Sequence, residues 1–88
     1  MGNDIFLTLC KKQVADYYNQ HADKSKGFIP MTTQEVFVVW SCKTLQNNKA
    51  LLSTTAHDGM YYELTYNGDK KELYFDAYKK WENKCIKC

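Results

Sequence analysis

Four cysteines and two histidines are the residues of this chain best suited to bind a metal or to attack a substrate. Cys85 and Cys88 form a C-x-x-C motif, and the remaining cysteines and histidines would complete a tetrahedral zinc site. A second C-x-x-C or H-x-H pair is missing, and Cys10 and Cys42 fall on faces predicted to be buried, where a thiol packs as a small hydrophobe. We therefore predict no metal site. Whether Cys85 and Cys88 are free, disulfide-linked or metal-bound is left open.

A thiol redox role and nucleophilic catalysis are not favoured either. The C-x-x-C motif ends the chain instead of opening a helix, where the helix dipole would lower a thiol pKa. His57-Asp58 lies in a predicted turn close to Ser53, Thr54 and Thr55, but no glycine-framed elbow or oxyanion-hole motif accompanies them. Carboxylates are scattered, and glycine-rich phosphate loops are absent from the sequence. We predict a protein that is not an enzyme, has no catalytic residues and needs no cofactor.

Composition restricts the partners. All 12 basic residues are lysines and the formal net charge is only +2, so arginine is not available for bidentate recognition of guanine or phosphate. Lysine can still make non-specific phosphate contacts. No apolar run reaches the length of a membrane span, and no cationic segment precedes an apolar stretch at the start. We expect a cytoplasmic protein without a membrane partner, folded as one domain over residues 1–88.

Hydrophobic periodicity predicts a helix followed by a sheet. Residues 3–21 carry apolar side chains at helical spacing, with Asn3 or Asp4 as cap. The stretch 22–31 contains Gly27 and Pro30 and is expected to be the longest loop. "TTQE" matches a capping box, but the β-branched and aromatic run "VFVVW" after it favours a strand. Strands are predicted over 36–45, 50–56, 60–66 and 71 to about 77, and a short helix from about Ala77.

Strand parity then assigns side chains to faces. Turns at 57–59 and 67–70 pair Leu52 with Leu64 and Leu64 with Leu73, so Tyr62 is predicted to lie in the core and Tyr61 on the opposite face. The first strand is ambiguous, and we favour the register with Trp40 inward, which needs an odd number of residues in the turn "QNNK". The predicted fold is α+β: an N-terminal helix packed on a four-stranded antiparallel meander, with a short C-terminal helix.

The outer sheet face is the remaining candidate site. On this register it is more apolar and aromatic than a solvated face needs to be. It could bind another protein, stack single-stranded nucleic acid with lysines along the phosphates, or be covered by the C-terminal segment or by a second copy in a homodimer. The residues predicted to bind the partner are Phe37, Lys43, Leu51, Tyr61 and Tyr74, with Val39 on the same face.

The stretches "VVWSCKTLQNNKALLSTT" and "DGMYYELTYNGDKKELYFDAYKKWENKC", with the opening helix, resemble a family of small uncharacterised proteins encoded by phages and prophages of Gram-positive bacteria. The resemblance implies phage origin and action in the cytoplasm of the infected host, but no activity and no functional residues. Small phage proteins outside the virion often bind a host or phage enzyme stoichiometrically. We therefore expect a non-enzymatic accessory protein that binds a host or phage protein. The alternative is a weak, sequence-tolerant binder of single-stranded nucleic acid.

Overall fold

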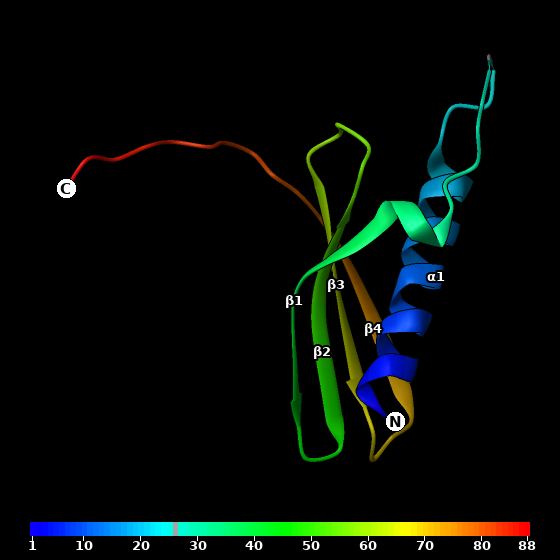
Figure 1. Cartoon of the computed structure of the whole chain (residues 1–88), viewed down its shortest axis with the longest axis vertical. Helices are drawn as coiled ribbons and strands as arrows, with labels where there is room; N and C mark the ends of the chain where they lie inside the picture. Colours follow the sequence, from blue (N-terminus) through cyan, green and yellow to red (C-terminus); the bar gives the residue numbers. More distant parts are fainter. Residues whose placement is uncertain (26) are drawn as a thin grey trace.

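The computed structural model of the chain describes residues 1–25 and 27–88 and consists of one helix lying along one face of one sheet (Figure 1). The four strands pair in chain order as an antiparallel meander, β1-β2-β3-β4. This confirms the predicted α+β fold. The elements are α1 (Asn3–His21), the 3-10 helix η1 (Thr33–Glu35), β1 (Val36–Thr44), β2 (Asn47–Thr54), β3 (Met60–Asn67) and β4 (Glu72–Lys79).

Helix α1 has the predicted bounds because its apolar residues recur every three or four positions and form one buried stripe. Gly2 is the N-cap, and no side chain caps the helix, so the predicted Asn3 or Asp4 cap is wrong. The stripe packs on the inner face of the sheet, which is the face toward α1. The core consists of Phe6, Cys10, Val14, Ala15, Met31, Val36, Ala50, Leu52, Tyr62 and Leu64.

The segment between α1 and β1 is fixed at two places. Asn19 on α1 makes two hydrogen bonds to the backbone of Met31: its side-chain oxygen accepts from the Met31 amide at 2.7 Å, and its side-chain nitrogen donates to the Met31 carbonyl at 3.0 Å. The capping-box match, which the sequence analysis set aside in favour of a strand, does form, with Thr32 as N-cap and Glu35 at the third position of η1, and β1 starts directly after it. The capping-box and strand patterns of the sequence are therefore both real and lie next to each other.

The central pairings keep the predicted faces but not the predicted partners. Leu52 lies opposite Tyr62, and Leu64 opposite Phe75, so each predicted register is wrong by two residues. An even shift leaves every side chain on its predicted face. Tyr62 is accordingly 2% exposed in the core, and Tyr61 points to the outer face opposite Tyr78.

Strand β1 changes face halfway along its length. The register shifts between Val38 and Trp40, where a β-bulge inserts Val39. Val36 before the bulge is buried, as predicted, whereas Trp40 after it lies opposite Leu51 on the outer face. The prediction that Trp40 points inward is wrong. One extra residue in a strand moves every later side chain to the opposite face of the sheet.

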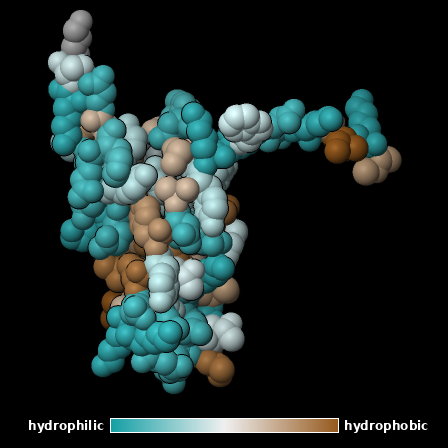
Figure 2. All heavy atoms as spheres, turned by 180° about the vertical axis from the view of Figure 1, so that it is seen from behind, coloured by the Kyte–Doolittle hydropathy of each residue, from teal (hydrophilic) through white to brown (hydrophobic). Residues whose placement is uncertain are grey.

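The C-terminal helix predicted from about Ala77 is not formed. Strand β4 continues to Lys79, where Lys80 donates its amide hydrogen to the Gly59 carbonyl, and residues 80–88 have no regular secondary structure. This C-terminal tail runs away from α1 and stands clear of the body (Figures 1 and 2). Trp81 in the tail is 94% exposed.

One buried polar side chain on the inner face should limit stability. Asn48 on β2 is 1% exposed, and neither atom of its amide has a hydrogen-bond partner among the described residues. Leaving a buried amide unsatisfied costs about 1–3 kcal/mol. We expect Asn48→Val to raise the free energy of unfolding by about 1–2 kcal/mol, because valine suits a strand and carries no polar atom.

Urea denaturation of both proteins measures this change. Asn47→Val is the matched control, since Asn47 is exposed and its side-chain oxygen accepts a hydrogen bond from the Gly68 amide at 3.2 Å. The control should be neutral or lose up to about 1 kcal/mol. A loss of stability in Asn48→Val would mean that the Asn48 amide is satisfied in the folded protein.

Candidate interaction surface

The residues that could bind a metal or act as nucleophiles do not come together. Cys10 is in the core, where burial raises the pKa of its thiol to about 12 and keeps it protonated. Cys42, Cys85 and Cys88 are exposed free thiols. Among the described residues, no three His, Cys, Asp or Glu side chains lie close enough to hold a metal ion.

The polar residues around His57 stabilise the loop between β2 and β3. The Ser53 hydroxyl donates to the Met60 carbonyl at 2.9 Å, and Asp58 accepts from the Met60 amide at 3.1 Å. Thr54 accepts from the Ala56 amide at 3.2 Å. These side chains are thus bonded to nearby backbone rather than arranged around a nucleophile, while His57 is exposed.

Within residues 1–25 and 27–88, no helix packs on the outer sheet face, because α1 lies on the inner one (Figure 1). Aromatic side chains from three strands lie on it, two from β1 and the rest from β3 and β4. Four of them, Phe37, Trp40, Tyr74 and Tyr78, are between 41% and 52% exposed. We name this surface the aromatic face and define it by Phe37, Trp40, Leu51, Tyr61, Tyr74 and Tyr78.

The structure brings four of the predicted binding residues together on the aromatic face and places the fifth elsewhere. Phe37, Leu51, Tyr61 and Tyr74 lie there, whereas Lys43 lies opposite the inward-facing Asn48. The Lys43 ammonium donates to the Met1 carbonyl at 3.0 Å. Lys43 is on the inner face because it follows the bulge, which the sequence pattern does not reveal.

Sequence reasoning missed two residues of the aromatic face and misplaced a third. Trp40 was expected in the core and Tyr78 in a C-terminal helix, and both lie on the face. Val39, which was predicted to lie on the face, is the extra residue of the bulge. The alternating pattern "LYFDAYK" in β4 was the available signal for Tyr78, since Tyr74, Asp76 and Tyr78 share one parity.

The charges on the aromatic face are mainly acidic. Glu63 and Asp76 lie directly opposite each other on β3 and β4, in the same row as Trp40 and Leu51. The Lys49 ammonium lies 3.7 Å from Glu63 and is the nearest compensating charge. A row of two carboxylates repels phosphates and favours a basic or neutral partner.

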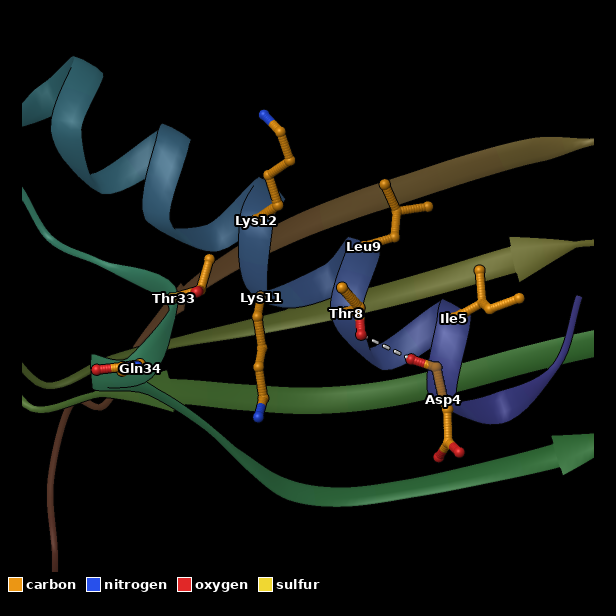
Figure 3. A pocket seen from close by; sticks show the side chains of 8 residues that line it. All are labelled: Asp4, Ile5, Thr8, Leu9, Lys11, Lys12, Thr33 and Gln34. Atoms are coloured by element: carbon orange, nitrogen blue, oxygen red, sulfur yellow. Dashed lines mark hydrogen bonds between the residues drawn. The ribbon is translucent and has the colours of Figure 1, made fainter.

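A shallow groove runs between α1 and η1 (Figure 3). Its residues are Asp4, Ile5, Thr8, Leu9, Lys11, Lys12, Thr33 and Gln34. The side chains diverge, with Ile5, Leu9 and Lys12 on one side of the helix and Asp4 and Lys11 on the other. The Thr8 hydroxyl is already bonded to the Asp4 carbonyl at 2.9 Å. This arrangement offers an apolar contact but no converging polar groups for catalysis.

The fold and this surface define a class of protein, a small α+β domain that covers one face of its sheet with a helix and exposes aromatic side chains on the other. The chain belongs to a family of unknown function, DUF6275, whose model matches residues 7–88. No curated protein and no solved structure matches the chain. No helix within the described ranges is long and apolar enough to cross a membrane.

Proposed function

We propose that this protein is a non-enzymatic accessory protein, encoded by a phage, that binds a host or phage protein stoichiometrically in the bacterial cytoplasm. The observation that supports the proposal is the aromatic face, where four large aromatic side chains are about half exposed. Tyrosine and tryptophan are enriched among the residues that dominate binding energy at protein interfaces. An uncovered face of this kind is typical of a binding surface.

The charges on the face favour a protein over the alternatives. Lys43, which was the expected phosphate contact, lies on the other side of the sheet, and Lys49 is next to Glu63. Nucleic acid would have to approach Glu63 and Asp76. A second copy packed face to face would bring two such carboxylate pairs together, which is unfavourable without compensating cations. A partner with basic and apolar side chains avoids both penalties.

Affinity capture from nuclease-treated lysate of a Gram-positive host, followed by titration with the purified partner, tests this function. We expect one stoichiometric partner whose affinity falls at least about tenfold for Trp40→Ala, since truncating an aromatic residue that dominates an interface costs about 2 kcal/mol or more. Tyr61→Ala should also weaken binding.

Trp81→Ala is the matched control, because Trp81 is a tryptophan in the tail rather than on the face. It should retain the partner, and circular dichroism should show that all three variants are folded. Binding that survives Trp40→Ala and Tyr61→Ala but not Trp81→Ala would move the site to the tail and contradict the proposal. A partner lost on nuclease treatment, with affinity that falls steeply with salt, would indicate nucleic acid instead.

A further inference from the structure

The C-terminal tail, residues 80–88, carries two large apolar side chains that the body of the protein does not cover. Trp81 is 94% exposed and Ile86 is 73% exposed. The tail leaves the end of β4 on the side of the sheet away from α1, which is the side of the aromatic face (Figure 1). Tryptophan is one of the residues that dominate binding energy at protein interfaces. The tail therefore has the composition of a docking segment.

The charges of the tail are complementary to those of the aromatic face. The tail has three lysines and one carboxylate, which are Lys80, Lys84, Lys87 and Glu82. The face carries Glu63 and Asp76 opposite each other, and among the described residues no lysine forms an ion pair with Asp76. A tail lying across the face would place its lysines near these carboxylates and Trp81 among aromatic rings.

The tail of the same chain is poorly placed to reach this face. The Lys80 amide donates to the Gly59 carbonyl at 2.7 Å, which keeps the start of the tail in line with β4. To lie on its own face the chain would have to reverse directly after this bond, and residues 81–88 contain no glycine or proline to form a tight turn. Such a reversal would also place Trp81 in the bend itself. A tail from a second copy has neither constraint.

We propose that the tail of one copy docks on the aromatic face of a second copy, with Trp81 among the exposed rings and the tail lysines near Glu63 and Asp76. Because each copy has a tail and a face, the exchange is reciprocal and closes as a two-fold dimer. The lysines of the tails compensate the carboxylates that would repel each other if two faces met directly. A protein that binds the same face displaces the tail and dissociates the dimer.

This proposal does not rest on the proposed function, because the two make different demands on Trp81. Self-association requires Trp81, whereas capture of a host or phage protein does not. A monomeric chain that captures a partner through Trp40 would overturn the dimer and leave the proposed function intact. A dimer that captures no partner would do the reverse.

Sedimentation equilibrium of the purified full chain under reducing conditions measures the self-association. We expect a monomer–dimer equilibrium with a dissociation constant of about 1–100 μM, which weakens with added sodium chloride because the charge pairs are exposed. Trp81→Ala and Trp40→Ala should each raise the dissociation constant at least about tenfold, since each removes an aromatic anchor from both contacts. A chain that stays monomeric up to about 1 mM would overturn the proposal.

Two exposed isoleucines provide a matched pair of variants. Ile86 is in the tail, whereas Ile29, which is 84% exposed, lies in the loop between α1 and η1. Ile86→Ala should weaken the dimer about threefold or more, because it removes apolar area from the contact. Ile29→Ala should associate as the wild type does. Equal effects of the two substitutions would mean that general surface hydrophobicity drives association, and would overturn the proposal.

A mixture of two variants tests the reciprocal arrangement. A Trp81→Ala chain keeps an intact face and a Trp40→Ala chain keeps an intact tail, so one intact contact forms when the two chains are mixed. We expect the mixture to associate at least about threefold more tightly than either variant alone. A dimer formed through two faces would not respond to Trp81→Ala, and one formed through two tails would not respond to Trp40→Ala. In both cases the mixture would not exceed the better variant, and the proposal would be wrong.

Three exposed thiols report which tail lies on which face. Cys42 follows Trp40 by two residues in β1 and shares its face, and Cys85 and Cys88 are in the tail. A bismaleimide crosslinker adds one maleimide to each of two thiols. Mass spectrometry of mixed isotope-labelled and unlabelled chains then separates crosslinks between chains from those within a chain. We expect Cys42 of one chain to be joined to Cys85 or Cys88 of the other. Crosslinks from Cys42 to the tail of the same chain, or only between tails, would overturn the proposal.

Discussion

Replacing Tyr62 by alanine is expected to lower the free energy of unfolding by about 3–5 kcal/mol, which is the range for truncating a buried aromatic residue. Tyr62 is 2% exposed and packs against Tyr17 and Phe75, so its removal leaves a cavity between α1 and the sheet. For a chain of 88 residues this is a large part of the total stability. Urea denaturation followed by circular dichroism measures the loss.

The neighbouring Tyr61 provides the control, because it differs only in the face to which it points. Tyr61→Ala removes the cross-strand contact with Tyr78 and should cost about 1 kcal/mol or less. Tyr62→Phe should be close to neutral, since it keeps the buried ring and its contact with Phe75 and removes only the hydroxyl. Equal losses in Tyr61→Ala and Tyr62→Ala would contradict the assignment of the two faces.

The features that local periodicity controls could be predicted from the sequence. Helix α1 was predicted with its observed bounds, because one continuous apolar stripe runs from Phe6 to Tyr17. The faces of β2, β3 and β4 were also predicted, even though both registers were wrong by two residues. Parity survives an even shift, so the opposition of Tyr61 and Tyr62 did not depend on the turn lengths.

The features that depend on backbone irregularity could not be predicted. The β1–β2 turn is formed by Leu45 and Gln46, with Leu45 in the left-handed region at φ 55°, whereas the sequence favours the two asparagines that follow. Before the bulge at Val39, the side chains of Val36 and Val38 lie on the inner face. No local pattern marks either feature, and together they decide that Trp40 and not Lys43 lies on the aromatic face.

The change in the composition of the face changes the functional argument as well. With Lys43 on the face, the predicted surface was suited to nucleic acid as well as to protein. The observed face carries Trp40 and Tyr78 but not Lys43, so it has more aromatic area than the predicted face. Glu63 and Asp76 also give it an acidic charge. The charge pattern therefore separates hypotheses that the aromatic residues alone do not distinguish.

A side chain at position 68 is expected to destabilise the end of the sheet where the two hairpin turns touch. A Cβ atom on Gly68 would lie inside contact distance of the Gln46 carbonyl oxygen, which belongs to the rigid backbone of the β1–β2 turn. We expect Gly68→Ser to lower the free energy of unfolding by about 1–3 kcal/mol, although serine suits turns in general.

Gly2→Ser is the matched control, since no atom lies within 4 Å of the added Cβ and serine is a favoured helix cap. Thermal denaturation should therefore show a lower midpoint for Gly68→Ser only, and an unchanged midpoint would mean that the two turns are not in contact in solution.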